Sequence, residues 1–302
     1  MGATLQRGVL FTPEQTNKLF SLVRGKSSLA KMSASEPMPF NGETVFTFNM
    51  DSEANLVGES GAKANGGATV ASVSMQPVKI EYGLRVSDEF KYGAEEIKLQ
   101  YLNAFSDGFA KKVARALDIM ALHGVNPRTG STASALNDKN FDDVVTNKVE
   151  FDEANINSNI ETAIGMVEAA EHEVTGLVMA PACKNALAQL KKGSSSYEAL
   201  YPELGWGAVP GTLNGLPIDS NSTVSFGSNA DRAIVGNFRD YFKWGFGKNI
   251  VIEVIEYGDP DNTGRDLKGY NEVYLRGEAY IGWGILVPSA FAKIRDEDPA
   301  SV

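Results

Sequence analysis

The chain has 302 residues, 38 of them acidic and 28 basic, and a formal net charge of −10 at pH 7. A hydrophobic content of 43% with a charged content of 22% is typical of a folded protein that buries a sizeable core, which excludes a disordered chain. The single cysteine, Cys183, cannot form an intramolecular disulfide, and the two histidines, His123 and His172, exclude a histidine-rich metal site.

The charge is unevenly distributed along the chain. Residues 1–35 carry a net charge of +4, so the remaining 267 residues carry −14. A protein that binds duplex DNA tightly normally presents a basic face, and this acidic body does not favour one. The first residues form no apolar segment and no run of about 18 apolar residues follows, so we expect neither a signal peptide nor a membrane span.

The first predicted elements are a short helix and a long hairpin. Residues 12–15 have the cap, proline and glutamine of a helix start, and Gly25 is a helix stop, so a short helix is expected in a basic arm. Apolar residues alternate over residues 43–50 and again over 78–86, and the segment 55–69 between them is rich in glycine. We predict that the two alternating segments pair as an antiparallel hairpin, whose apolar face needs a partner surface.

A strong helical stripe follows the hairpin. Apolar residues recur every three or four positions from about residue 95 to residue 122, which predicts a helix roughly 40 Å long. The stripe consists of Ile97, Tyr101, Phe105, Phe109, Val113, Leu117 and Met120.

The second half of the chain mixes predicted helices and strands. A helix is expected from Ile156 to near Gly176, and another begins at Pro181. Strands are expected at residues 177–180, 233–235, 250–257 and 272–280. The sequence therefore predicts an α+β fold.

Two segments resemble enzyme motifs but lack a defining residue. Gly25, Lys26 and Ser27 match the end of a phosphate-binding loop, yet Phe20 occupies the position of its first glycine. Residues 58–62 nearly spell the nucleophile motif Gly-x-Ser-x-Gly but end in alanine, and they lie in a hairpin tip. We therefore expect neither a nucleotide site nor a serine hydrolase, and we predict that the protein is not an enzyme.

Three further candidates are interpreted as structural. Residues 259–264 resemble the opening of a calcium-binding loop, with carboxylates at positions one and three and glycine at six, but position twelve is Tyr270 instead of glutamate. This segment is interpreted as an acidic turn between strands. His123 ends the long helix and His172 lies on the polar side of the next helix, where both are expected to be structural. No cofactor or metal site is expected.

The order of these elements resembles the Hong Kong 97-type fold of tailed-phage major capsid proteins. Near the hairpin and the long helix, the matching stretches are residues 55–59, 76–80, 86–89 and 124–130. In the second half they are residues 176–181, 212–217, 233–238, 273–278 and 287–292. Each stretch is short, but together their order covers nearly the whole chain, and this makes the resemblance specific.

The resemblance implies a division of the chain into parts. By this resemblance, the chain would begin with an N-terminal arm at 1–39 and an extended hairpin loop at 40–86. A peripheral domain at 87–150, with the long helix as its spine, would follow, then an axial domain at 151–256 and a return to the peripheral domain at 257–302. The hairpin would pack on the next subunit. The residues expected to make such contacts are Phe46, Phe48, Glu59, Lys63, Ile80, Tyr82 and Arg85.

The resemblance also implies a function and partners. The chain would be a structural protein of the virion, assembled in the host cytoplasm into hexamers and pentamers of an icosahedral shell around double-stranded DNA. Its partners would be further copies of itself, a portal, a decoration protein and DNA held by weak nonspecific contacts, with no membrane. Some family members begin with a long assembly domain, whereas about 40 residues precede this hairpin, so a separate scaffolding protein, or none, is expected.

The type member of the family cross-links its own subunits, and three residues here have a similar spacing. They are Lys63 in the hairpin tip and Asn271 and Glu278 near the closing strand. The amine would attack the carboxamide while Glu278, expected in an apolar setting, takes the proton. The alternative is a flexible tip lysine and an ordinary strand glutamate that faces Arg276 or solvent.

Two other classes remain open. An encapsulin-type nanocompartment shares this fold and assembles around cargo enzymes instead of a genome. A soluble enzyme would need a pocket that these residues do not supply. The basic arm and the long hairpin favour the capsid interpretation.

Overall fold

The computed structural model describes residues 22–23, 25–50, 52–63, 65–93, 95–193, 196–227 and 230–296. The helix expected from residue 12 to Gly25 lies almost entirely outside these residues. A helix that the sequence did not predict, α2 (Ser28–Met32), follows it. The hydroxyl of Ser27 accepts a hydrogen bond from the Ala30 amide and caps this helix.

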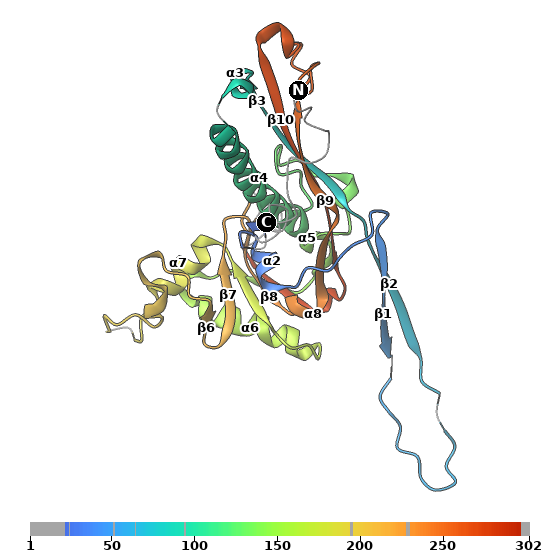
Figure 1. Ribbon diagram of the computed structural model, residues 1–302. Helices are drawn as coiled ribbons and strands as arrows, with labels where there is room; N and C mark the ends of the chain where they lie inside the picture. The colour runs from blue at the N-terminus through green and yellow to red at the C-terminus, as the bar shows by residue number, and fades with distance from the viewer. Residues whose placement is uncertain are drawn as a thin grey trace.

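A two-stranded antiparallel hairpin projects from the body of the molecule (Figure 1). It consists of β1 (Glu43–Met50) and β2 (Ala68–Met75), which pair along their whole length. A hairpin that begins with the predicted strand at 43–50 is present, but the predicted pairing of this strand with residues 78–86 is wrong. That segment is β3 (Val78–Ser87), which pairs with β10 (Glu272–Ile285) in another sheet. The small alanine and serine side chains of β2 give it a weak strand pattern, whereas the larger apolar residues of β3 are needed in the core.

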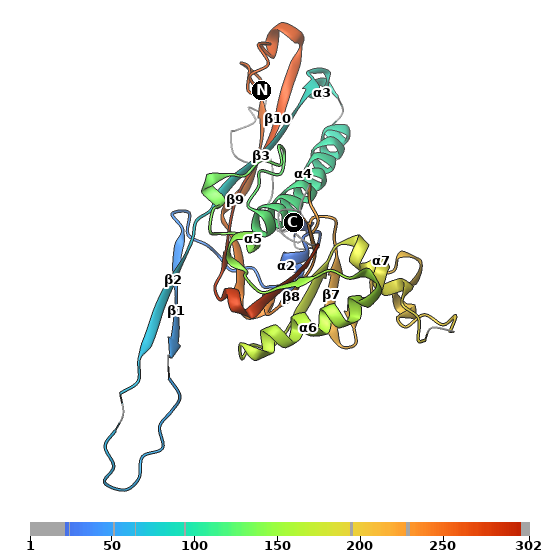
Figure 2. The ribbon, with the colours of Figure 1, turned by 180° about the vertical axis from the view of Figure 1, so that it is seen from behind.

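The second sheet is antiparallel and has the order β3–β10–β9, with β9 spanning Phe242–Ile255. The short helix α3 (Glu89–Tyr92) and the long helix α4 (Glu95–His123) follow β3, and α4 runs beside the sheet in both views (Figures 1 and 2). The ring of Phe109 lies directly on the backbone of Gly277, where an added Cβ would be 2.9 Å from the ring.

The 29 residues of α4 confirm the predicted long helix. Its stripe from Phe105 to Met120 is buried, but Tyr101 is 56% exposed, and the side chain of Ile97 lies outside the described part of the chain. The helix therefore packs along its C-terminal half.

The third sheet has six strands in the order β4–β11–β8–β5–β7–β6. These strands are β4 (Lys148–Glu150), β5 (Gly176–Met179), β6 (Thr212–Leu213), β7 (Leu216–Ser220), β8 (Asp231–Gly236) and β11 (Phe291–Arg295). The shorter helical elements are η1 (Ser134–Leu136), α5 (Phe141–Val144), η2 (Glu153–Asn155), η3 (Pro202–Gly207), α8 (Phe238–Tyr241), η4 (Lys268–Tyr270) and η5 (Pro288–Ala290).

Two helices, α6 (Ile156–Ala169) and α7 (Pro181–Gln189), pack on this sheet. The predicted end of α6 near Gly176 is wrong because the chain leaves the helix earlier. Glu171 adopts a left-handed conformation with φ 62, and the amide of His172 bonds back to the carbonyl of Val167. This is the geometry that closes helix C-termini.

The central strands of the six-stranded sheet, β5, β8 and β11, are buried on both faces. Ile234 of β8 belongs to the core that contains α4, whereas its neighbours Ala233 and Val235 belong to the core beneath α6 and α7. In β5, Val178 likewise faces the first core. Burial on both sides explains why these strands read as continuous apolar runs in the sequence. Among the residues described, none of the helices combines the length and hydropathy needed to cross a bilayer.

Candidate assembly surfaces

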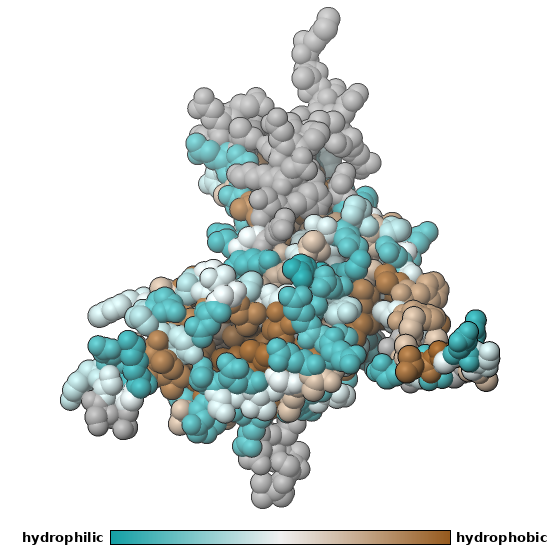
Figure 3. All heavy atoms as spheres, turned by 90° about the horizontal axis from the view of Figure 1, so that it is seen from below, coloured by the Kyte–Doolittle hydropathy of each residue, from teal (hydrophilic) through white to brown (hydrophobic). Residues whose placement is uncertain are grey.

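One face of the hairpin carries large apolar side chains in contact with solvent. Phe46, Phe48 and Met50 are 71%, 64% and 74% exposed, and Val70, which lies opposite Phe48, is 60% exposed. Apolar atoms are visible on the projecting hairpin when the molecule is seen from below (Figure 3, right). A contiguous exposed apolar surface of this kind marks a site of protein interaction.

The base of the hairpin is fixed to the body. Met75, at the end of β2, is buried, and its side chain lies with that of Val73 over Gly284 of β10. An added Cβ at Gly284 would lie 2.6 Å from Cγ of Met75, so the two strands approach each other closely. The hairpin therefore leaves the body in a direction set by packing at its base.

The seven predicted contact residues divide into two groups. Five have exposed side chains and are free to meet a neighbouring subunit: Phe46, Phe48, Glu59, Lys63 and Tyr82. The other two, Ile80 and Arg85, have partners inside the subunit. Ile80 packs against the core, and Arg85 forms ion pairs with acidic residues near β10. Placing Ile80, Tyr82 and Arg85 on the hairpin was wrong because β3 pairs with β10.

The three cross-link candidates are not brought together within one subunit. Lys63 lies in the exposed hairpin tip, and Asn271 adopts a left-handed conformation just before β10. Glu278 lies seven residues further along this strand, roughly 20 Å from Asn271 at the rise of an extended chain. The expected apolar setting of Glu278 is wrong, since its carboxylate lies 2.7 Å from Nζ of Lys79 and 3.5 Å from Nε of Arg276.

Two buried carboxylates hold the segment around α2 against the body. Asp118 of α4 is fully buried and accepts hydrogen bonds from the Ser27 hydroxyl at 2.5 Å and the Ser28 amide at 3.0 Å. Asp219 of β7 accepts from the Ser28 hydroxyl and binds the Lys31 ammonium at 2.6 Å. Burial raises the pKa of Asp118 to about 6 although these donors favour its charged form. Neither carboxylate was predicted as a binding group from the sequence, because Ser28 lies 90 positions from Asp118 and 191 positions from Asp219 in the chain.

His123 belongs to a buried polar cluster beneath the end of α4. Its Nδ1 lies 2.9 Å from a carboxylate oxygen of Asp142, and its Nε2 lies 2.8 Å from the carbonyl oxygen of Thr223. Lys293, fully buried on β11, donates to Asp142 Oδ1 at 3.1 Å and to the carbonyl of Phe141. Both ring nitrogens of His123 thus face acceptors, which favours a doubly protonated ring.

The pKa values of this cluster follow from burial and charge. Burial lowers the pKa of His123. The hydrogen bond to Asp142 and the charge of that carboxylate raise it by more than burial lowers it, so the net shift is upward. Burial raises the pKa of Asp142, and the opposing contacts with His123, Asp231 and Lys293 lower it well below its usual range. The pKa of Asp231 is raised by burial and by its like-charged neighbour Asp142.

Acceptor atoms of His123, Asp142 and Asp231 lie within 4.8 Å of one another, close enough to ligate a metal ion. The ammonium of Lys293 already supplies a positive charge there, and a doubly protonated imidazole has no free lone pair for a metal. The cluster is therefore best explained as an internal ion-pair network, which agrees with the structural role predicted for His123.

The other singled-out residues also have local roles. His172 contacts the ring of Tyr241 and the hydroxyl of Ser289. Cys183 is buried, and burial raises the pKa of its thiol to about 12, so it stays protonated and unreactive at neutral pH. Ser60 lies in the hairpin tip, whereas both histidines lie in the body.

The sequence profile of the phage capsid family matches residues 7–296. The chain belongs to the phage capsid family. A solved chain from Mycobacterium phage Ogopogo is 30% identical, with a TM-score of 0.78 over 98% of this capsid protein and 97% of that chain. A chain from Gordonia phage Cozz is 23% identical, with a TM-score of 0.73, and the match covers 90% of this capsid protein and 87% of the Cozz chain. Among proteins with curated descriptions, none matches this capsid protein.

The same fold occurs in a more distant particle. A chain in a structure described as the capsid of a native GTA particle is 14% identical, with a TM-score of 0.62 over 99% of this capsid protein and 95% of that chain. The predicted α+β capsid fold is therefore confirmed at the level of the whole chain. The protein is a structural major capsid protein of a tailed phage, and the encapsulin alternative is not favoured.

Proposed function

We propose that this capsid protein assembles into hexamers and pentamers of an icosahedral shell that encloses double-stranded DNA. The observation that carries this proposal is the projecting hairpin, whose Phe46, Phe48 and Met50 are exposed on one face. Burying such side chains against another subunit contributes about 1.5–3 kcal/mol each when burial is complete. A lattice repeats this contact at every subunit, so a modest contact is multiplied across the shell.

In this proposal each part of the fold has a place in the shell. Helix α4 and the sheet β3–β10–β9 form the peripheral domain, with α4 as its spine. Strand β3, expected in the hairpin loop at 40–86, and strand β9, expected in the axial domain at 151–256, are assigned to it because both pair with β10. The six-stranded sheet with α6 and α7 forms the axial domain near the capsomer centre, and it includes β11, expected in the return segment at 257–302, because β11 pairs with β8. Two findings support this division: the described residues form two cores, and strands β5 and β8, which contribute to both, lie between them.

The hairpin of one subunit lies on the next subunit in the shell. Phe46 and Phe48 supply the apolar contact, whereas Glu59 and Lys63 at the tip and Tyr82 on β3 contribute polar contacts at its edges. Exposure of all five side chains supports this assignment. Ile80 and Arg85 are not included because their partners lie within the subunit.

The hairpin proposal predicts the behaviour of a double variant, Phe46→Ser with Phe48→Ser. Because both side chains are exposed, the stability of the unassembled subunit should change by less than about 0.5 kcal/mol per substitution. Assembly should fall sharply, as measured by light scattering and electron microscopy of the full-length protein. The matched control, Phe46→Leu with Phe48→Leu, keeps the apolar face and should still form shells. Serine variants that assemble as well as the wild type would contradict the proposal.

Covalent cross-linking between subunits remains part of the proposal. Lys63 lies in the hairpin tip and Asn271 lies just before β10, so the two do not meet within one subunit. The lysine amine of one subunit would therefore attack the Asn271 carboxamide of another, forming an amide bond and releasing ammonia. Glu278 would take the proton only after its ion pair with Lys79 opens. Boiled, reduced particles should then show a ladder of bands that is absent in Lys63→Arg, and a single band near 32.5 kDa would rule the reaction out.

Membership of the family implies a location in the virion. We further propose assembly in the host cytoplasm, with a scaffolding protein, a portal and a decoration protein as partners. The acidic composition of the body supports weak, nonspecific contact with the packaged DNA.

A further inference from the structure

The turn between β9 and β10 has the spacing of a calcium-binding loop. Asp259, Asp261 and Thr263 occupy its first, third and fifth positions, Gly264 occupies the sixth with φ 77, and the carbonyl of Arg265 lies at the seventh. In calcium loops of this type, oxygens at positions one, three, five and seven surround the ion, and glycine at six allows the sharp turn. The sequence pattern alone predicts only an acidic turn for this segment.

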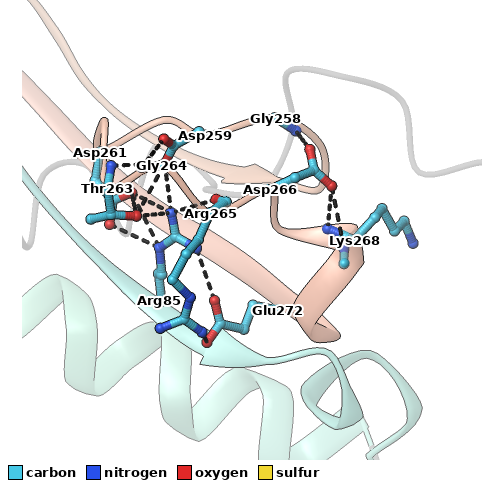
Figure 4. A network of polar contacts seen from close by, with 11 residues as sticks. Arg85, Gly258, Asp259, Asp261, Thr263, Gly264, Arg265, Asp266, Lys268 and Glu272 are labelled. Atoms are coloured by element: carbon cyan, nitrogen blue, oxygen red, sulfur yellow. Dashed lines mark hydrogen bonds and ion pairs between the residues drawn. The ribbon is translucent and has the colours of Figure 1, made fainter.

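A cation from another strand occupies the centre of this loop (Figure 4). The guanidinium nitrogen Nη2 of Arg85, on β3, is surrounded by the four oxygens of the calcium pattern. Its distances are 2.7 Å to Asp259 Oδ1, 2.5 Å to Asp261 Oδ1, 2.7 Å to Thr263 Oγ1 and 2.9 Å to the carbonyl oxygen of Arg265. The loop thus surrounds one nitrogen atom as it would surround a metal ion.

More oxygens surround Nη2 of Arg85 than its hydrogens can bond. An Nη2 group carries two hydrogens, yet four oxygens lie within 2.9 Å of it. The other guanidinium nitrogens have partners of their own: Nε donates to Asp261 Oδ2 and Nη1 to Glu272 Oε2, each at 2.9 Å. At most two of these four oxygens can accept a hydrogen from Nη2, so the set of oxygens is larger than the donors of this nitrogen and resembles the oxygen set of a metal site.

We propose that Arg85 is the built-in cation of a calcium-type loop, and that the loop binds Ca²⁺ once this guanidinium is removed. The charges are consistent with this exchange. Asp259, Asp261 and Glu272 face Arg85 and Arg265, whose own guanidinium binds Glu272 at 3.1 Å. Without Arg85 these groups would carry a net charge of −2, which one Ca²⁺ ion neutralises.

The loop is already shaped for an ion by its own backbone. The amide of Gly264 donates to Asp259 Oδ2 at 2.6 Å, and the amide of Gly258 donates to Asp266 Oδ2 at 3.1 Å. The first of these bonds, with the Thr263 amide that donates to Asp259 Oδ1 at 3.1 Å, holds the Asp259 carboxylate in place independently of Arg85, and the second closes the turn. Glu272, at the start of β10, binds the neighbouring nitrogen Nη1 of Arg85 at 2.9 Å, and it would supply the acidic ligand that Tyr270, at position twelve, does not provide.

A built-in cation makes this turn independent of free metal. The side chain of Arg85 is 13% exposed, and its hydrogen bonds to Asp261 and Glu272 raise its pKa further, so the charge stays in the loop at any physiological pH. The β9–β10 turn should keep its shape in a chelator, whereas a calcium-dependent turn would open. This property belongs to the subunit and does not depend on how the shell is built.

The experiment compares full-length wild type with Arg85→Ala in CaCl₂, in MgCl₂ and in EDTA. The melting temperature of the wild type should be the same in all three. Arg85→Ala should melt lower in EDTA and recover by about 3 °C or more at saturating Ca²⁺, with a smaller response to Mg²⁺, which demands octahedral geometry. Tb³⁺ luminescence gives a direct measure of binding, because Tyr274 lies opposite Arg85 in the register and can sensitise the ion.

Two controls separate this proposal from a general effect of losing an arginine. Arg265→Ala removes a neighbouring guanidinium that does not enter the loop and should create no Ca²⁺ response. Adding Asp259→Asn and Asp261→Asn to Arg85→Ala should abolish the response. If Arg85→Ala does not fold in EDTA, its refolding yield with and without Ca²⁺ provides the same comparison. A Ca²⁺ response of Arg85→Ala no larger than that of the wild type would overturn the proposal.

Discussion

Ionisable residues beneath the end of α4 make stability depend on pH in a predictable direction. The pKa of Asp231 is raised in the folded subunit, so between about pH 4 and its raised pKa the native state holds a proton that the unfolded chain has lost. The pKa of His123 is also raised, so its contribution is complete below about pH 6.5 and is lost as the pH rises through the folded value. Both groups therefore make the subunit less stable as the pH increases.

We expect the free energy of unfolding of the unassembled subunit to decrease from pH 5 to pH 8. Each unit of raised pKa corresponds to about 1.4 kcal/mol. Urea denaturation at a series of pH values measures this slope. Asp231→Asn keeps the shape of the side chain without its titration, and should flatten the slope below pH 7. A slope unchanged by this substitution, or a gain in stability toward pH 8, would show that other groups control the pH dependence.

At the scale of elements, the close approach of α4 to β10 depends on a residue without a side chain. The ring of Phe109 fills the space where Gly277 would carry a Cβ, with three ring atoms within 3.0 Å of that position. Gly277→Ala should therefore displace α4 from the sheet and destabilise the subunit by about 1–3 kcal/mol. Urea denaturation of the unassembled protein measures this loss.

A second glycine provides the control for this prediction. Gly108, in α4 itself, has no described atom within 4 Å of an added Cβ, apart from its chain neighbours and the nearby backbone of its own helix. Gly108→Ala should stabilise the subunit by up to about 1 kcal/mol, because alanine loses less conformational freedom in a helix. If both substitutions had the same sign, the contact between Phe109 and Gly277 would not be what limits the packing of α4.

The elements also show what sequence patterns can predict. The apolar periodicity of α4 was sufficient to predict this helix, since over 29 residues the apolar positions repeat many times. The partner of β1 was not predictable, because β2 has only a weak strand pattern and the pairing of the strongly alternating β3 depends on its contacts with β10 and α4. Helix α2 was missed because its five residues are too short for a periodic signal and its cap, Ser27, is held by the distant Asp118.

At the scale of the whole molecule, the exposed hairpin was predictable and the internal ionic networks were not. Alternation placed Phe46 and Phe48 on one face, and no partner surface was evident nearby in the sequence. The loop around Arg85 showed its acidic spacing, but its cation comes from a strand 174 or more positions earlier. Local patterns reveal an incomplete site, whereas the residue that completes it depends on the tertiary fold.

The net charge of the whole subunit predicts how its assembly responds to salt. Outside the basic arm the chain carries −14, so approaching subunits repel one another through solvent. Salt shortens the Debye length to about 8 Å at physiological ionic strength and weakens this repulsion, while apolar contacts by Phe46 and Phe48 are little affected. We therefore expect the assembly rate, followed by light scattering at constant protein concentration, to rise from low to physiological salt.

Substitutions on an exposed helix face distinguish repulsion from attraction as the controlling force. Glu161 and Glu168 of α6 are exposed, so Glu161→Gln with Glu168→Gln reduces the negative charge of the body with little effect on folding. This variant should assemble faster than the wild type at low salt and depend less on ionic strength. A rate that falls with added salt would instead mean that attraction between the basic arm and the acidic body controls assembly, because screening weakens attractive and repulsive contacts alike.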